Sequence, residues 1–236
     1  MAIDDLPLPV VNFLNVIGVP WPYINEDQVT QFATLTRQFG TAVQTTHADA
    51  AGKVSAIASA HQAASTQKMA NGWQKLSDQH VTEILDGCEV LAAALDAAAG
   101  YIVAQKAAAI AELIGMAAAF VADQAAAFVT FGASEAALPL IEEAANKLME
   151  SLINDLVQYV IGEVVEAAAK PLFAKVEAML SGLDWSQSGA AGPGKGTGLE
   201  LDAAAVRAAT VALRGHGSDM RAHAAAFASG VRGLGF

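Results

Sequence analysis

The stretch from residue 91 to residue 131 reads LAAALDAAAGYIVAQKAAAIAELIGMAAAFVADQAAAFVTF and contains no proline. Alanine is the best helix former, and the aromatic residues that favour strands make up only 6% of the chain. Residues 74–131 hold only scattered glycines, so we expect one very long helix there, bent near Gly87 or Gly100 and ending at Thr130-Phe131-Gly132. The sequence therefore predicts an all-α protein, an elongated bundle of long antiparallel helices with a C-terminal helical arm.

The N-terminal side of this stretch carries two helix signals. Apolar residues from Val10 to Ile17 predict a short helix that ends at Gly18 and the turn Pro20-Trp21-Pro22. Asn25, with Gln28 three residues later, has the spacing of a capping box, in which each side chain satisfies a backbone N–H of the first turn. A second helix is therefore expected from this point.

This second helix shows the spacing of a coiled-coil seam. Its seam residues recur in alternating three- and four-residue steps, at positions 29, 32, 36, 39, 43, 46 and 50. We expect the helix to continue to about Thr66. The run Met69-Ala70-Asn71-Gly72-Trp73 predicts the first internal break of the chain.

Beyond Gly132, Ser134 predicts the cap of a further helix that runs to about Leu183. Pro139 lies near its start, where proline is tolerated, whereas Pro171 lies inside it and predicts a kink because it lacks the N–H donor. The Gly/Ser/Pro-rich residues 184–198 are typical of a flexible linker. The predicted domain plan is a helical body over residues 1–183, this linker, and an amphipathic helical arm over residues 199–236.

The arm carries the sharpest pattern in the chain. Apolar residues recur every seven residues, and arginines follow one position later: Val206, Leu213, Met220, Phe227 and Leu234 are the apolar positions, and Arg207, Arg214 and Arg221 are the basic ones. Such a repeat keeps one stripe facing a partner helix. The stripe either docks on the body of the same chain or binds a second chain. Gly215 and Gly217 interrupt the pattern, so the arm is either one weakened helix or a short hairpin.

The charge of the chain argues against nucleic acid as a partner. The formal net charge is −11; residues 191–236 carry +2 of it and the remainder carries −13. An acidic body repels phosphates, so binding of DNA or RNA by the body is not expected. The N-terminus has Asp4 and Asp5 where a secretory signal peptide has positive charge. The single cysteine, Cys88, is expected to be a small buried residue.

No arrangement of residues in the sequence predicts catalysis. Gly189–Thr197 resembles a phosphate-binding loop, but Gly196 replaces the Ser or Thr that must follow Lys195. His47, His61, His80, His216 and His223 form no metal-binding spacing, and the paired carboxylates are spread along helix faces. We expect no catalytic, cofactor-binding or metal site and no enzyme activity. The longest uncharged run within residues 101–131 covers only residues 113–122, so a buried helix is expected there and not a membrane span.

A family resemblance emerges from these elements. The chain resembles the WXG100-like N-terminal domains of actinobacterial polymorphic toxins, which are exported by type VII secretion. The resemblance rests on Asn71-Gly72-Trp73, the Ala/Leu-rich helix with Lys106, the breaking run Thr130–Ser134, and a closing helix with Pro171 near its end. It extends to the opening Trp21-Pro22 and Asn25-Glu26-Asp27 and to the arm at Leu201–Val206. Two features depart from the family pattern: Gly72 precedes Trp73 instead of following it by two residues, and residues 185–236 contain no tyrosine for an export motif.

The resemblance implies a function as well as a fold of helical hairpins. It implies a non-catalytic leader or delivery domain of a type VII secreted effector or toxin, cytoplasmic before export, that docks by helix–helix contact on a small WXG100-type partner and on the secretion apparatus. A homo-oligomer is a further possibility for the docked state. Two alternatives stay open: a pore-forming domain that inserts into a membrane, and a structural coiled-coil adaptor. The candidate interaction residues are Gly72, Trp73, the export-motif pair Tyr159 and Glu163, and the stripes of the arm.

Overall fold

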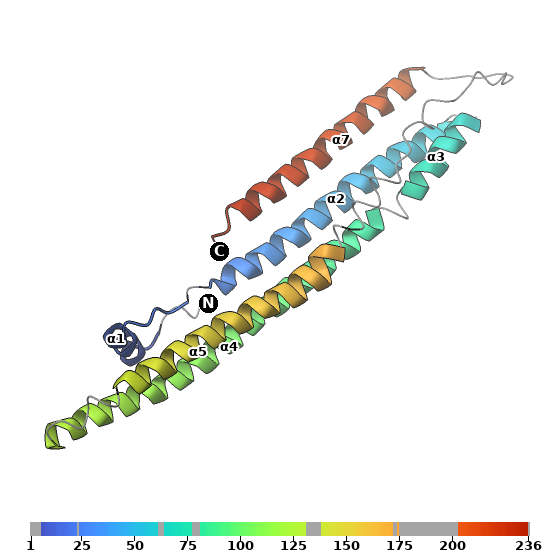
Figure 1. The fold of residues 1–236 in the computed structure, drawn as a ribbon. Helices are drawn as coiled ribbons and strands as arrows, with labels where there is room; N and C mark the ends of the chain where they lie inside the picture. The colour runs from blue at the N-terminus through green and yellow to red at the C-terminus, as the bar shows by residue number, and fades with distance from the viewer. Residues whose placement is uncertain are drawn as a thin grey trace. The chain divides into compact units, whose positions relative to one another are not determined.

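The computed structural model describes residues 6–22, 24–60, 64–76, 81–130, 138–171, 174 and 203–235, and these residues form helices and no strand. The helices, in chain order, are α1 (Leu8–Ile17), α2 (Glu26–Ala60), α3 (Ala64–Leu76), α4 (Thr82–Thr130), α5 (Leu138–Tyr159), the π-helix η3 (Val160–Ala169) and α7 (Ala203–Arg232). Figure 1 shows their order along the chain. The all-α prediction is confirmed. The predicted linker lies outside the described residues.

The chain divides into two compact units. Unit 1 consists of Met1–Gln31, Ala94–Glu166 and Gly235–Phe236, and unit 2 consists of Phe32–Ala93 and Ala167–Leu234. Unit 1 therefore holds α1, the first turns of α2, most of α4, and α5 with most of η3. Unit 2 holds the rest of α2, α3, the start of α4, and α7.

In unit 1, the short helix α1 ends as its sequence predicts. Gly18 adopts a left-handed conformation with φ of 71°, which glycine reaches without a Cβ penalty. Its N–H and that of Val19 both donate to the carbonyl of Leu14, so the last turn of α1 is closed. Phe13 packs its ring against Phe120 of α4 with the centroids 5.8 Å apart, which places α1 on α4.

The core of unit 1 lies along one face of α4 and one face of α5. The buried residues of α4 recur at helical spacing: Leu95, Ala98, Ala99, Ile102, Lys106, Ala109, Leu113 and Ala117. On α5 they are Ala145, Met149, Leu152 and Leu156. Tyr101 of α4 stacks on Tyr159 of α5 with the ring centroids 4.0 Å apart and the planes 9° apart, so the two helices are in contact.

The π-helix η3 has an explanation in the spacing of apolar residues. These residues occur in pairs every four positions, as Leu152-Ile153, Leu156-Val157, Val160-Ile161, Val164-Val165 and Ala168-Ala169. On an α-helix a four-residue step rotates forward by about 40°, so a buried face would drift around the helix. The wider π turn, with hydrogen bonds from i to i+5, rotates less per residue and corrects this drift. Val164 and Ala168 are accordingly buried, as Leu152 and Leu156 are.

The kink predicted at Pro171 stays a prediction, because the residues on its C-terminal side lie mostly outside the described ones. The helix irregularity occupies Val160–Ala169, directly before Lys170 and Pro171, and Pro171 itself is still helical. The end of this helix, predicted near residue 183, lies outside the described residues, as do Gly132 and Ser134.

In unit 2, α2 packs against the start of α4 where side chains are small. A Cβ added at Gly40 would meet the Cβ of Cys88 at 3.4 Å, so glycine allows a close approach of the two helices. Arg37 pairs with Glu89 at 3.6 Å at the exposed edge of this contact. Cys88 is buried, as predicted, and burial raises the pKa of its thiol.

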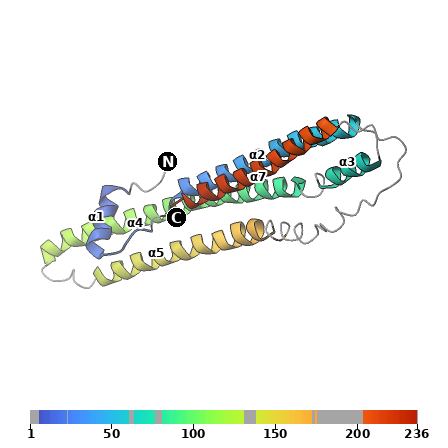
Figure 2. The same cartoon turned by 90° about the horizontal axis from the view of Figure 1, so that it is seen from above.

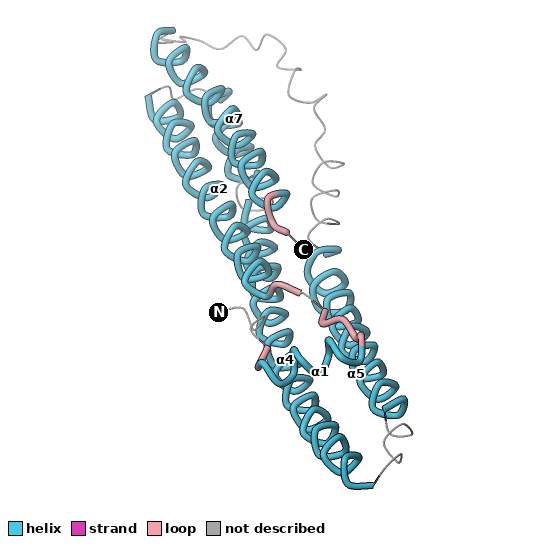
Figure 3. Tube along the Cα trace, turned by 90° about the vertical axis from the view of Figure 1, so that its left-hand side faces the viewer, coloured by secondary structure: helices cyan, strands magenta, loops and turns pink. Residues whose placement is uncertain are grey.

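The arm docks on α2 within unit 2. Phe227 of α7 stacks on Phe39 with the ring centroids 5.1 Å apart and lies 6.3 Å from Phe32, while Thr46 and His223 share a hydrogen bond of 2.9 Å. Residue numbers fall along α7 as they rise along α2, so the two helices are antiparallel, and all three views show them side by side (Figures 1, 2 and 3). Of the two alternatives for the arm, docking in the same chain is the one observed. α7 also continues as one helix through Gly215 and Gly217.

The break predicted at Met69–Trp73 is wrong. These residues are helical and belong to α3. The described part of α4 runs unbroken from Thr82 through Gly87 and Gly100. A single glycine costs a helix only about 1 kcal/mol, which packing of the neighbouring Trp73 can offset.

Among the described helices, α4 between Thr82 and Asp123 is long and apolar enough to cross a membrane. Length and composition alone do not separate a membrane span from the core helix of a bundle, because both are apolar. The uncharged run of residues 113–122 is shorter because Glu112 and Asp123 end it, whereas a membrane span can contain one or two charged residues. α4 contributes much of the buried core of unit 1, as described above.

Candidate functional site

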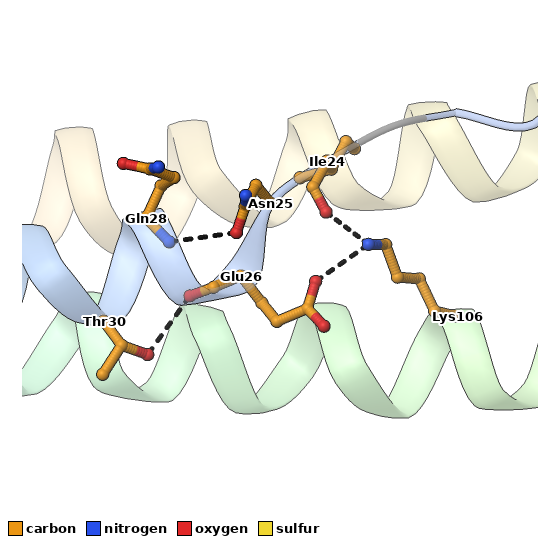
Figure 4. A network of polar contacts seen from close by, with 6 residues as sticks. All are labelled: Ile24, Asn25, Glu26, Gln28, Thr30 and Lys106. Atoms are coloured by element: carbon orange, nitrogen blue, oxygen red, sulfur yellow. Dashed lines mark hydrogen bonds and ion pairs between the residues drawn. The ribbon is translucent and has the colours of Figure 1, made fainter. Parts of the chain in front are cut away.

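The most unusual side chain of unit 1 is Lys106, which has no exposed surface although it carries a charge. Its Nζ lies 2.8 Å from Oε2 of Glu26, itself only 3% exposed, and donates a second hydrogen bond to the carbonyl of Ile24 (Figure 4). Glu26 is the first residue of α2, so the lysine of α4 holds the point where α2 begins.

Local hydrogen bonds shape the same corner. The side-chain oxygen of Asn25 accepts from the backbone N–H of Gln28 at 3.2 Å, which confirms one half of the predicted capping box (Figure 4). The reciprocal half is absent, because the side-chain oxygen of Gln28 is buried with no hydrogen-bond partner. The hydroxyl of Thr30 donates to the carbonyl of Glu26. The start of α2 is thus held by its own cap and by Lys106.

The contacts of this ion pair indicate a structural role. A buried charge without a partner costs several kcal/mol, so each member requires the other. Lys106 contacts the carboxylate of Glu26 and the backbone carbonyl of Ile24, and both groups belong to the start of α2 or the residues just before it. Among the described residues no group of three or more His, Cys, Asp or Glu side chains could hold a metal ion.

The outer surface of α5 and η3 presents an apolar face in unit 1. Ile153, Val157, Ile161 and Val165 recur every four residues and are 38–51% exposed, whereas the adjacent face of the same helix is buried in the core. We call these four residues the outer face of α5/η3. A row of large aliphatic side chains left in water is typical of a surface that another molecule covers. Sequence analysis missed it, although the four-residue spacing was visible.

Trp73 lies in unit 2 against α2. Its ring stacks on that of His47 with the centroids 5.1 Å apart and the planes 8° apart, and its indole N–H is buried with no hydrogen-bond partner. Burial lowers the pKa of His47. The neighbouring Gly72 is exposed. The structure therefore places the tryptophan in a helix–helix contact and its glycine on the surface.

The other predicted interaction residues divide between the two units. Tyr159 is half-buried in its stack on Tyr101, and Glu163 is exposed on η3, both in unit 1. On α7, in unit 2, Leu213, Met220 and Phe227 are half-buried and Arg207, Arg214 and Arg221 are exposed. Val206 is helical, but its side chain lies outside the described residues. The structure thus places the apolar stripe of the arm and its arginines on different faces of α7.

A family model described as a WXG100-like domain matches residues 5–147, more than half of the chain. The chain belongs to the WXG100-like domain family. Members of this family are typically non-enzymatic helical proteins, and the family is associated with type VII secretion and with protein–protein contact between helices. No curated protein and no solved structure matches the chain.

The matched region bears on the features above. It contains the Glu26–Lys106 pair and Trp73, so the WXG100-like part of the chain includes the buried ion pair. The outer face of α5/η3 and the whole of α7 follow residue 147 and are features of the remaining part.

Replacement of Lys106 tests the ion pair. Lys106→Met leaves a buried carboxylate unpaired, and Glu26→Gln leaves a buried ammonium unpaired, so each is expected to lower the free energy of unfolding by about 3–5 kcal/mol. The double variant Lys106→Met/Glu26→Met removes both charges and is expected to regain most of that loss. Urea denaturation followed by circular dichroism measures all three.

A matched control is available in unit 1. Lys147 and Glu143 form an exposed i,i+4 pair on α5 at 2.7 Å. Lys147→Met is expected to cost less than about 0.5 kcal/mol, because solvent screens the pair. Equal losses for Lys106→Met and Lys147→Met would contradict the structural role of the buried pair.

His47 predicts a pH dependence of stability. The folded state binds a proton on His47 less readily than the unfolded state, whose histidine keeps its ordinary pKa of about 6.5. As the pH falls below that value, the unfolded state binds more protons and the free energy of unfolding decreases. Thermal melting from pH 8 to pH 5 is expected to show a smaller loss in His47→Gln than in the wild type. Superimposable profiles would rule out this contribution.

Proposed function

We propose that this protein is a non-catalytic leader or delivery domain of a type VII secreted effector or toxin, and that it docks on a small WXG100-type partner through its helices. The observation that carries the proposal is the outer face of α5/η3, four large aliphatic residues exposed on a helix whose other face is already packed. The family membership supplies the association with type VII secretion.

The physical argument for docking rests on the two faces of one helix. Burial of apolar surface contributes about 25 cal/mol per Å². A second helix that packs on the outer face removes this surface from water and thereby stabilises the complex. Apolar anchors at regular helical spacing are what a helical partner recognises. Surfaces of this kind are uncommon on the monomers of soluble proteins.

The motif residues have proposed roles in the same process. Gly72 exposes the helix surface beside Trp73, so a partner helix can approach the backbone there, while the stack on His47 orients the indole. Tyr159 and Glu163 have the spacing of an export motif, and Glu163 is accessible to a recognition component of the secretion apparatus. Export from a strain with an inactivated type VII apparatus, compared with its parent, separates this proposal from a coiled-coil adaptor that stays in the cell.

Co-purification tests the docking face. The chain is co-expressed with the small WXG100-type proteins encoded beside its gene, and a one-to-one complex is identified by its mass in solution. Val157→Glu/Ile161→Glu places two charges in the interface and is expected to weaken the complex by at least tenfold, because each charge loses its hydration on binding.

The matched control for that experiment is Asn154→Glu/Gln158→Glu. It adds the same charge to exposed residues of the same helix, next to the outer face but outside it. It is expected to leave the complex intact. Equal binding by both double variants would exclude the outer face of α5/η3 as the docking surface.

A second candidate function, pore formation, is favoured by one observation. α4 is long and apolar enough to cross a membrane. Insertion would have to expose the face of α4 that now lies in the core of unit 1, including Lys106. Release of a dye from liposomes across a range of pH tests it: release that Lys106→Met accelerates would support insertion, and no release at any pH would exclude it.

A further inference from the structure

The helix α7 has two stripes of different chemistry. Its inner stripe, with Met220, His223 and Phe227, faces α2 within unit 2 and makes the contacts with Phe39 and Thr46. The packing of these side chains fixes the rotation of α7 about its own axis. A second stripe is therefore held in a defined orientation away from this contact.

The outer stripe of α7 is basic and regular. It comprises Arg207, Val211, Arg214, Ser218, Arg221 and Ala225, in steps of four, three, four, three and four residues, and all six are exposed. Val211, the aliphatic residue of this stripe, is 69% exposed. Alternating steps of four and three are the spacing that a partner helix follows.

The three arginines have no partner within the described part of the chain. No ion pair or hydrogen bond joins Arg207, Arg214 or Arg221 to another described residue, although the chain carries a net charge of −11. The carboxylate nearest in sequence, Asp219, lies two residues before Arg221, and residues two apart do not face each other on a helix. The carboxylates of the described residues thus leave this stripe unneutralised.

We propose that the outer stripe of α7 is a docking surface for a helix of another protein whose carboxylates recur every seven residues. Successive arginines stand seven residues, or about 10.5 Å, apart along the axis. Carboxylates at that interval on a facing helix meet each guanidinium in turn, as flanking charges do in coiled coils, and guanidinium–carboxylate pairs are bidentate. Val211, Ser218 and Ala225, each four residues after one of the arginines, are small enough to let the two helices approach.

Other acidic partners match the stripe less well. Double-stranded DNA carries one charge per about 1.7 Å, far denser than this row. Segments that bind anionic lipid carry clusters of about four to eight basic residues, whereas this face offers three in a line on a chain whose remainder is acidic. The outer stripe of α7 lies in unit 2, whereas the outer face of α5/η3 lies in unit 1. A negative test of one docking surface therefore leaves the proposal for the other unaffected.

Synthetic peptides test the spacing with the full chain. The probes are three labelled 28-residue alanine-rich helical peptides: one with glutamate at every seventh position, one with the same composition in irregular order, and one with lysine in place of glutamate. Fluorescence anisotropy is expected to give about tenfold tighter binding of the regular glutamate peptide than of the irregular one. That binding is expected to weaken in 0.5 M salt, where exposed charges are screened.

Charge reversal on the protein completes the test. Arg207→Glu/Arg214→Glu/Arg221→Glu is expected to lose at least tenfold in affinity for the glutamate peptide and to bind the lysine peptide instead. Lys53→Glu/Lys68→Glu/Lys75→Glu changes the net charge equally on exposed positions of α2 and α3 and is expected to keep the wild-type preference. Circular dichroism confirms that both variants remain helical. Replacement of the three arginines by lysine is expected to keep the preference for the glutamate peptide but to weaken the binding, because an ammonium group forms no bidentate pair with a carboxylate.

Three outcomes would overturn the proposal. Equal affinity for the regular and irregular glutamate peptides would show that the stripe does not read spacing. Binding to phosphatidylserine vesicles without binding to any peptide would assign the stripe to a membrane surface. A dimer of the chain that the arginine variant abolishes, without peptide binding, would assign it to a second copy.

Discussion

The buried ion pair between Lys106 and Glu26 is the constraint on which unit 1 depends. Alanine-rich faces pack closely but have little shape to define one register, because neighbouring turns present almost identical surfaces. A lysine with no exposed surface has one acceptable arrangement, in which its charge meets a carboxylate and a carbonyl. The pair thus defines which turn of α4 lies against the start of α2, and the small apolar side chains fill the space around it.

Local chemistry made most of the fold predictable from the sequence. Gly18 and Asn25 act within one helical turn, and their roles as caps need no tertiary information. The predicted break at Met69–Trp73 failed because the contact that offsets the glycine is distant: Trp73 stacks on His47, which lies on another helix. A local signal was overridden by packing that only the folded chain provides.

The candidate surfaces were harder to predict for the same reason. Lys106 and Glu26 both stood among the residues that carried the family resemblance, but they are 80 positions apart and nothing local pairs them. The arginines of α7 were identified from their spacing, whereas the absence of a partner for them among the described residues depends on how the chain packs. The outer face of α5/η3 could have been predicted from the sequence, because apolar pairs at four-residue intervals give a helix two apolar faces. The core of unit 1 covers only one of them.

The packing of α7 on α2 determines which of its residues a partner can contact. By packing its inner stripe on α2, the arm covers part of its apolar surface and leaves an outer stripe in which three of the six residues are arginines. Exposed ion pairs add little affinity but select partners and speed association, whereas an apolar face supplies affinity with little selectivity. A chain that carries both, one in each unit, therefore combines a proposed surface for affinity on α5/η3 with a proposed surface for selectivity on α7. An acidic body strengthens that discrimination, because it repels acidic partners everywhere except along the arginine row.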